Sequence, residues 1–313
     1  MVSALCRVLT AALLLASWPA YARTLEVGPG KPYAQPSEAA AAAKSGDRVV
    51  IAAGEYFDCA VWPQSNLVIE GDPGGGTVIT DKSCQGKGLF VIPGNDVTVR
   101  NLTLTRARVP DGNGAGIRAE GRNLVIEHVR FINNQNGILA HDQPQGSLIV
   151  RDSEFLRNGV CEQACAHGIY AGQLGLVRIE RSIFRETRQG HHIKSRALRT
   201  EIVGCDIADG PEGSASFLVE IPIGGSLLLQ SNRMEKGPKS ENHRAAVMIG
   251  AEGVAQPTRE ILVEGNEFRA DGDYPTTFVY NMTATDAVLR DNRIEGRQVK
   301  QLHGDGTVLA GNR

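Results

Sequence analysis

The stretch Ile179–Phe184, IERSIF, places an aliphatic residue five positions before a large apolar one. This spacing occurs eight times along the chain, in the pairs Val99/Leu104, Ile126/Phe131, Val150/Phe155, Ile179/Phe184, Ile202/Ile207, Leu229/Met234, Val263/Phe268 and Leu289/Ile294. From Leu104 to Ile294 the mean interval is about 27 residues, which is typical of solenoid arrays. The recurrence predicts a chain built from stacked copies of one structural unit.

Between these pairs lie further short strand candidates, which follow polar, glycine-containing turns. Gly137-Ile138 and Gly168-Ile169 are two of them. Each repeat therefore holds at least two short strands, and no segment with helical periodicity intervenes. This pattern favours a coil of stacked parallel strands over a fold that alternates strands with helices. We predict an all-β right-handed parallel β-helix, which is a solenoid.

Several segments resemble a known family. They are NNQNGI (133–138), AHGIY (166–170), GHHIKSRA (190–197) and SASFLVEIPIGG (214–225), which are similar to the repeats of bacterial pectate-lyase-like parallel β-helix proteins. The resemblance covers nearly all of the mature chain and implies a carbohydrate-active β-helix protein. The acidic cluster that binds calcium in many pectate lyases is not evident, and the Asp-Pro-His-Asp motif of alginate epimerases is absent. We predict no metal and no cofactor.

The first residues have the pattern of an export signal. An apolar run over 8–17 is followed by Ala20-Tyr21-Ala22, which is typical of a secretory signal peptide cleaved before Arg23. The run is shorter than the roughly 20 residues that a membrane span needs. We predict a signal peptide over 1–22, a single parallel β-helix domain over 23–313 with no membrane span, and a secreted or periplasmic location.

The two ends of the solenoid are expected to differ. Ser37 is a candidate N-cap for a short Ala-rich helix that Gly46 would end, and this helix would cover the N-terminal end of the core. Residues 307–313 resemble the start of another coil, similar to 287–293, and no cap is evident after them. Because uncapped strand edges can pair with another chain, we expect a homo-oligomer through the C-terminal end.

Charge and cysteine content narrow the partners and the compartment. The chain has 33 basic and 35 acidic residues, so no global field favours nucleic acid as a partner. Five cysteines remain after the signal peptide, and export makes disulfides the expected state. We predict the pairs Cys161–Cys165 and Cys59–Cys84. Cys205 falls in a column of small polar residues and is expected to be a buried structural thiol.

The stretch GHHIKSRA (190–197) alternates in the manner of a strand. His192, Lys194 and Arg196 are expected on its outer face, while the small or apolar residues between them pack inward. His191 is expected to point the opposite way and to be structural, and His167 is expected to make a turn hydrogen bond. The outer row of three basic side chains is the candidate site.

Stacking neighbouring coils extends this row into a surface. If Ile193 and Phe217 share an inward column, outward residues align in two columns at the strand spacing of about 4.8 Å. One column holds Leu139, Tyr170, Lys194 and Leu218, and the other holds His141, Gly172, Arg196 and Glu220. They form one sugar-sized patch, with open surface beside Gly172 and with His141 and Glu220 as substrate-binding residues.

The residue types in this patch suit a polysaccharide lyase. β-Elimination in a uronic-acid-containing chain needs a base, cations that stabilise the carbanion, and an acid for the leaving oxygen. We predict Lys194 as the base, with a pKa lowered by Arg196. Arg196, held by Glu220, would bind the substrate carboxylate. Tyr170 or His192 would protonate the leaving oxygen of an acidic polysaccharide.

Other functions stay open. A β-helix glycoside hydrolase needs two carboxylates, for which the patch offers Glu220 and, as a second candidate, Asp142. A uronate epimerase would share the first half of the elimination reaction. A non-catalytic polysaccharide-binding or envelope-assembly protein would need only the groove and its charges.

Overall fold

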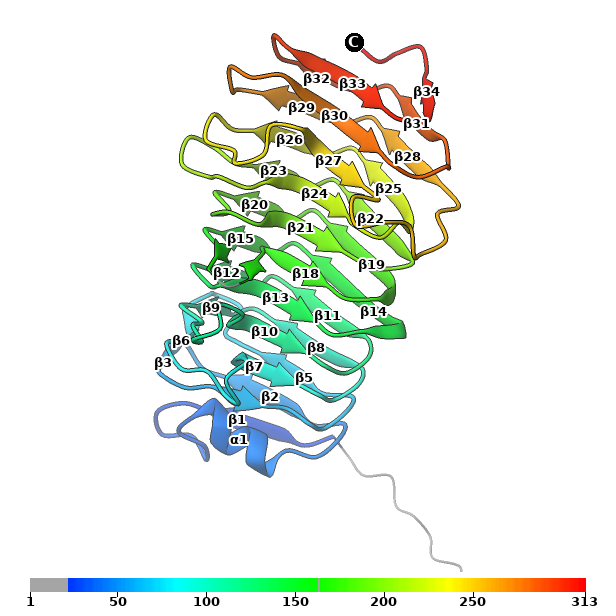
Figure 1. Ribbon diagram of the computed structural model, residues 1–313. Coiled ribbons are helices and arrows are strands. Elements are labelled where there is room, and N and C mark those ends of the chain that lie inside the picture. The colour runs from blue at the N-terminus through cyan, green and yellow to red at the C-terminus, as the bar shows by residue number, and fades with distance from the viewer. Residues whose placement is uncertain (1–21, 163) are drawn as a thin grey trace, which may run out of the picture.

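The structure is a computed structural model that describes residues 22–313 apart from residue 163, as a coil of short parallel strands (Figure 1). The predicted signal peptide falls almost wholly on residues 1–21, outside the described part. The strands form sheets of 12, 10 and 10 members, here called sheets A, B and C. Each turn of the chain passes through A, then B, then C. The predicted all-β right-handed parallel β-helix is confirmed.

The three sheets have the following strands. Sheet A holds β1 (Thr24–Val27), β2 (Arg48–Ile51), β5 (Val68–Glu70), β8 (Val97–Arg100), β11 (Leu124–Glu127), β14 (Gln143–Arg151), β19 (Leu174–Glu180), β22 (Arg199–Val203), β25 (Ser226–Gln230), β28 (Ile261–Glu264), β31 (Ala287–Arg290) and β34 (Gly306–Val308). Sheet B holds β3 (Gly54–Tyr56), β6 (Thr77–Thr80), β9 (Thr103–Thr105), β12 (Arg130–Ile132), β15 (Glu154–Leu156), β20 (Ile183–Arg185), β23 (Asp206–Ala208), β26 (Arg233–Lys236), β29 (Glu267–Ala270) and β32 (Arg293–Glu295). Sheet C holds β4 (Ala60–Val61), β7 (Gly88–Ile92), β10 (Ala115–Ala119), β13 (Asn136–Ala140), β18 (Ile169–Ala171), β21 (His191–Ser195), β24 (Phe217–Ile221), β27 (Ala245–Ile249), β30 (Thr276–Asn281) and β33 (Val299–His303).

The repeated apolar pairs line the inside of the coil. Ile179 on β19 lies beside its equivalents on β14 and β22, and Phe184 on β20 lies beside those on β15 and β23. Phe131, Phe155 and Phe184 stack with ring centroids 4.7 and 4.6 Å apart. Each is fully buried, and burying a side chain of this size stabilises the fold by about 1.5–3 kcal/mol.

The corner between sheets A and B explains the column of small polar residues. Its first residue has a positive φ in many coils, as at Arg181 (47°) and Gly204 (64°), and the next side chain points inward. Asn232, Asn266 and Asn292 form a ladder there: Oδ1 of Asn266 and of Asn292 accepts from the backbone and side-chain N–H groups of the asparagine before it, and Oδ1 of Asn232 accepts from the backbone N–H of Cys205. Cys205 occupies the same column. It is buried, and burial raises the pKa of its thiol to about 11, as expected for a structural cysteine.

The N-terminal end is covered by α1 (Pro36–Ala42), which packs against β1 and β4. The predicted short capping helix is therefore present, but Ser37 is not its N-cap. Gln35 takes that position and Pro36 opens the helix. The backbone N–H of Ser37 donates to Oδ2 of Asp58 at 2.8 Å, so a carboxylate from the next coil satisfies it.

The C-terminal end is more open. β34 and β33 are the last described strands of sheets A and C, and Val308 and Leu309 are each 43% exposed. The homo-oligomer expected at this end stays a prediction. Within residues 22–313 no helix is long and apolar enough to cross a membrane.

Candidate functional site

The outer face of sheet C does not follow strict alternation. In β21, His192 and the residue after it both lie inside the coil, so the outward positions are His191 and Lys194. His192 is fully buried, with Nδ1 2.8 Å from Oγ1 of Thr187 and Nε2 2.9 Å from Oδ1 of Asp209. The prediction that His192 lies on the outer face is wrong, because two consecutive side chains of β21 are buried inside the coil and strict alternation does not hold there.

The same departure from alternation in β24 changes the predicted register. Lys194 pairs with Tyr170 on β18 and with Glu220 on β24. The prediction instead set Lys194 beside Leu218 and placed Phe217 in the inward column. In the structure Leu218 belongs to the core and Phe217 lies on the outer side. The correct register brings the ammonium of Lys194 directly to the carboxylate of Glu220.

Two histidines and a phenylalanine stack beside these residues. The ring of His191 lies 4.8 Å from that of His167 and 5.2 Å from that of Phe217. The backbone N–H of His191 donates to Nδ1 of His167 at 3.0 Å, and that of Phe217 donates to Nδ1 of His191 at 3.2 Å. A ring nitrogen that accepts an N–H carries no proton, so the proton of each neutral ring lies on Nε2. Burial lowers the pKa of both imidazoles, so they are neutral at pH 7.

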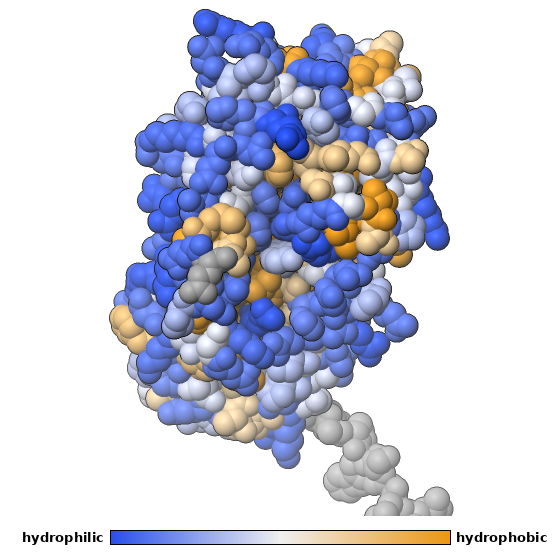
Figure 2. Space-filling view, viewed as in Figure 1, coloured by the Kyte–Doolittle hydropathy of each residue, from blue (hydrophilic) through white to orange (hydrophobic). Residues whose placement is uncertain are grey.

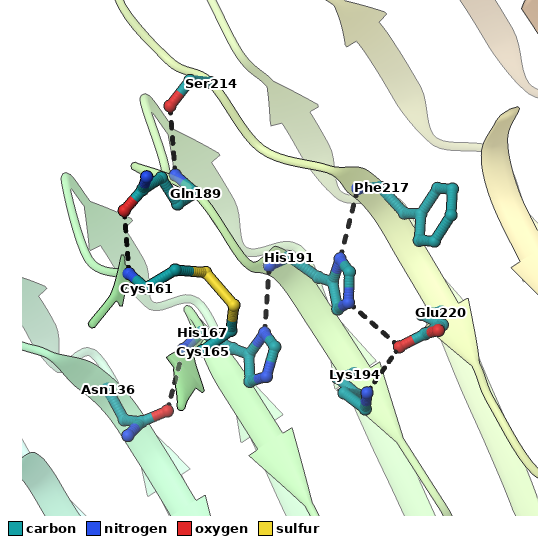
Figure 3. Close-up of a disulfide and its surroundings, with 10 residues drawn as sticks. All are labelled: Asn136, Cys161, Cys165, His167, Gln189, His191, Lys194, Ser214, Phe217 and Glu220. Carbon is teal, nitrogen blue, oxygen red and sulfur yellow. Dashed lines mark hydrogen bonds and ion pairs between the residues drawn. A yellow bond between two sulfur atoms is a disulfide. The ribbon is translucent and has the colours of Figure 1, made fainter. Parts of the chain in front are cut away.

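Glu220 is the buried anion of the site (Figure 3). Its Oε2 lies 3.0 Å from Nε2 of His191 and 2.9 Å from Nζ of Lys194. Burial alone would raise the pKa of this carboxyl group, but His191 and Lys194 outweigh burial and lower it to about 2. Glu220 is therefore ionised at any neutral or mildly acidic pH. His191, expected to be structural, belongs to the site.

A second carboxylate reaches the site from the loop after β27. Oε1 of Glu252 lies 2.7 Å from Nζ of Lys194, and Oε2 lies 2.5 Å from a terminal nitrogen of Arg196. Sequence reasoning missed Glu252 because it lies outside the repeated strands. The one available signal was the length of the interval between 249 and 261, which exceeds the tight turns of other coils.

Arg196 and Tyr170 form the remaining pair. Nε of Arg196 donates to the hydroxyl oxygen of Tyr170 at 3.0 Å, and its guanidinium carbon lies 5.7 Å from the Tyr170 ring centroid. The ammonium of Lys194 lies 5.8 Å from the same centroid. Two cations thus lie near one aromatic ring, an arrangement in which the ring attracts both. The predicted neighbourhood of Tyr170, Lys194 and Arg196 is present.

The charge state of Lys194 differs from the prediction. Burial would lower the pKa of its ammonium, but Glu220 and Glu252 outweigh burial and raise it above the usual 10.5. The predicted lowering by Arg196 is wrong, because that reasoning counted a cation and omitted two anions. The Lys194 side chain is also 11% exposed, so it is a buried group rather than a surface one.

A disulfide-linked hairpin leads into this cluster. Strands β16 (Val160–Cys161) and β17 (Cys165–Ala166) are antiparallel, and the structure joins Cys161 to Cys165. His167 follows directly, and its N–H donates to Oδ1 of Asn136 at 2.8 Å (Figure 3). A second disulfide joins Cys59 to Cys84, in the N-terminal coils.

Comparison with solved structures agrees with this architecture. The chain is similar to pectate lyase Pel9A, with a TM-score of 0.63 and 15% identity, over 93% of this chain and 78% of that one. It is also similar to an alginate lyase from Paenibacillus sp. str. FPU-7, with a TM-score of 0.59 and 16% identity, over 89% of this chain and 99% of that one. The fold is that of the pectate-lyase-like right-handed parallel β-helices. No protein-family model matches the sequence, and no curated protein is similar to it.

Two predicted features lie apart from the cluster in this pectate-lyase-like β-helix. His141 is exposed in the turn after β13, and within the described part of the chain no hydrogen bond or ion pair links its side chain to the site. The open surface predicted beside Gly172 is filled. A Cβ at Gly172 would come within 2.4 Å of Oδ1 of Asp142, which itself accepts the N–H of Gln173 at 2.8 Å.

The cluster contains two carboxylates, two buried imidazoles, an ammonium and a guanidinium, so donors of several kinds are close together. In residues 22–313 without 163, no group of three or more His, Cys, Asp or Glu side chains is arranged to hold a metal ion. Hydrophilic residues dominate the face of the molecule that carries sheet C (Figure 2). The cluster brings together groups that can exchange protons and two cations that hold one carboxylate.

Proposed function

We propose that this protein is a polysaccharide lyase that cleaves a uronic-acid-containing polysaccharide by β-elimination. The observation that carries the proposal is the clamp formed by Lys194 and Arg196. In the structure this clamp binds the side-chain carboxylate of Glu252 through both of its oxygens. The hydroxyl of Tyr170 adjoins the same guanidinium. The similar structures named pectate lyase and alginate lyase support the substrate class, because pectate and alginate are both polyuronates.

The clamp suits the first half of β-elimination. Removal of the proton next to a uronate carboxylate sends negative charge into that carboxylate, and a cation already in place stabilises the charge as it forms. Arg196 fills this role in the proposal, and Lys194 becomes the second cation when it takes up the proton. Because Glu220 and Tyr170 hold these two side chains in position, little reorganisation is needed when the charge develops.

Two proton transfers complete the reaction. The base removes the proton from the carbon next to the carboxylate, a double bond forms between that carbon and the next, and the bond from that next carbon to the glycosidic oxygen breaks. We assign the base to Lys194 and the acid to Tyr170. Since Tyr170 accepts from Arg196, its own O–H stays free to donate to the leaving oxygen. Because the pKa of Lys194 is raised above 10.5, little of its neutral form is present at pH 7, and the neutral fraction grows as the pH increases. We therefore expect kcat/KM to rise toward alkaline pH.

The alternatives fit the charge states less well. A glycoside hydrolase needs one carboxyl group that is protonated at working pH. Cations lower the pKa of both Glu220 and Glu252 against the opposing effect of burial, so both are ionised. An epimerase would share the clamp and the base, and a purely binding protein would need only the clamp. We further propose that the protein acts outside the cytoplasm, on the basis of residues 1–22.

The test is to incubate the purified protein with pectate, alginate and other acidic polysaccharides across pH 6–11 and to follow the absorbance of the unsaturated uronate. β-Elimination predicts this signal, with a rate that rises with pH. New reducing ends without it would indicate hydrolysis, and binding without either product would indicate a non-catalytic role. Lys194→Met should abolish the signal, while the matched control Lys239→Met should keep it, since Lys239 is an exposed lysine paired with Glu212 on the surface.

A further inference from the structure

The loop that carries Glu252 is held against the preceding coil by its backbone. The N–H of Glu252 donates to the carbonyl of Pro222 at 2.8 Å, and the N–H groups of Ala255 and Gln256 both donate to the carbonyl of Ile223 at 2.8 Å. The loop between β27 and β28 accordingly turns back toward β24 and β25 (Figure 1). The backbone of Glu252 is thus fixed, and only its side chain is free to leave the site.

The two carboxylates of the cluster differ in access. The Glu220 side chain is 5% exposed, whereas that of Glu252 is 41% exposed. All residues from 251 to 255 are exposed, so solvent and solutes reach Glu252 from outside. Rotation of this side chain would free one face of the clamp without opening the core.

The Glu252 carboxylate stands where a substrate carboxylate would be bound. One oxygen meets the Lys194 ammonium and the other meets the Arg196 guanidinium. A uronate carboxylate has the same size, charge and geometry. If the clamp binds such a group, the loop and the substrate cannot occupy it together.

We propose that Glu252 fills the carboxylate subsite of the ligand-free protein as an internal competitor, and that the substrate displaces it by turning its side chain outward. This inference rests on the proposed function, because it takes Lys194 and Arg196 as the clamp for a uronate. An attached competitor is present at a high effective concentration, so a single uronate binds weakly. A chain of several uronates gains contacts elsewhere on sheet C and can overcome it. Glu252 therefore selects polymers over monosaccharides.

Displacement also changes the partners of Lys194. When Glu252 leaves, Lys194 keeps Glu220, with Arg196, Tyr170 and the neutral imidazole of His191 as its other neighbours. One of its two anionic partners is then exchanged for the substrate carboxylate. The competitor and the substrate therefore alternate at the same two cations.

The test compares binding of single uronic acids and uronate trisaccharides, of the galacturonate, mannuronate and guluronate types, by calorimetry at neutral pH. Glu252→Gln should bind the single uronate roughly tenfold more tightly than wild type, with a smaller gain for the trisaccharide. Glu260→Gln is the matched control, since Glu260 lies at the other end of the loop and pairs with Arg199. It should bind as wild type does. The double variant Glu252→Gln/Arg196→Met should lose the gain.

The outcomes separate this inference from the proposed function. Equal or weaker binding by Glu252→Gln, with lyase activity present in wild type, would overturn the internal competitor alone. Tighter binding without any unsaturated product would support the competitor and overturn β-elimination. Failure of every uronate to bind either protein would overturn both.

Discussion

Sheets A and C each carry a row of ion pairs between neighbouring strands, and the basic side chains of the two rows differ in solvent exposure. On sheet A, Arg178 and Arg199 flank Glu201, at 2.6 and 2.5 Å. On sheet C, Lys194 contacts Glu220 at 2.9 Å on the neighbouring strand. The arginines of the first row are 39% and 38% exposed, while Lys194 is 11% exposed.

The difference comes from what covers each sheet. The loop over 250–260 folds back onto the start of the segment after β24 and covers part of sheet C. Exposed ion pairs contribute about 0–1 kcal/mol. Breaking a buried pair by removing one partner costs about 3–5 kcal/mol, because a charge is left unpaired. Burial by a loop, rather than the identity of the charges, separates a candidate site from a solvated surface.

The largest difference between the two rows is expected for the substitution Lys194→Met. Activity should fall about 100-fold to 10,000-fold, as expected for loss of a general base. The free energy of unfolding should also fall by about 3 kcal/mol, since Glu220 keeps only His191 as a partner. Denaturant unfolding and initial rates measure the two effects. A variant as stable as wild type would show that the sheet C pair is no stronger than a surface pair.

The two rows should also differ in how the free energy of unfolding depends on pH under acidic conditions. The folded pKa of Glu220 is about 2, below the ordinary value of 4.5, so its contribution to stability is present above pH 4.5 and is lost as the pH falls toward 2. The difference corresponds to about 3 kcal/mol. Glu220→Gln should flatten the acid limb of unfolding measured from pH 6 to pH 2. Glu201→Gln should change it less, and the reverse order would contradict the comparison.

Tyr170→Phe should separate chemistry from stability within the site. The ring stays beside the two cations and only the hydroxyl is lost, so the free energy of unfolding should change by about 1 kcal/mol or less. The rate should fall about 100-fold or more if the hydroxyl protonates the leaving oxygen. A rate within threefold of wild type would remove Tyr170 from the mechanism.

The smallest effect is expected on sheet A. Arg178→Ala should change the free energy of unfolding by less than about 1 kcal/mol, because Glu201 keeps Arg199 as a partner and Arg178 itself is 39% exposed. Activity should be unchanged. Thermal unfolding and the lyase assay check both, and a loss comparable to that of Lys194→Met would show that exposure does not rank these pairs.

The fold was predictable because the apolar pairs repeat wherever the coil closes. Ile179 and Phe184 are inward for a reason that acts locally, namely a corner with one left-handed residue between two short strands. The grouping of residues in the candidate site was predictable in part, since Lys194 lies beside both Tyr170 and Glu220.

The errors in the site have physical causes. Strict alternation cannot predict two inward residues in succession. The sequence therefore indicated His192 as the outward histidine, whereas the structure places His191 in the site and His192 inside the coil. Glu252 belongs to a loop without periodicity, so no pattern connects it to Lys194, which lies 58 residues earlier in the chain. The pKa of Lys194 depends on that loop, and its direction could not be derived without it.

The two consecutive inward side chains in β21, β24 and β27 have a consequence for engineering. They leave two outward positions per coil, His191 and Lys194 on β21, with Ala245 and Met248 at the same places on β27. Coils of a solenoid contact mainly their neighbours, so each pair of outward positions can be changed with little effect on strands further along. The exception is Lys194, which also contacts Glu252 from the loop two coils further on, so a substitution there changes that loop as well.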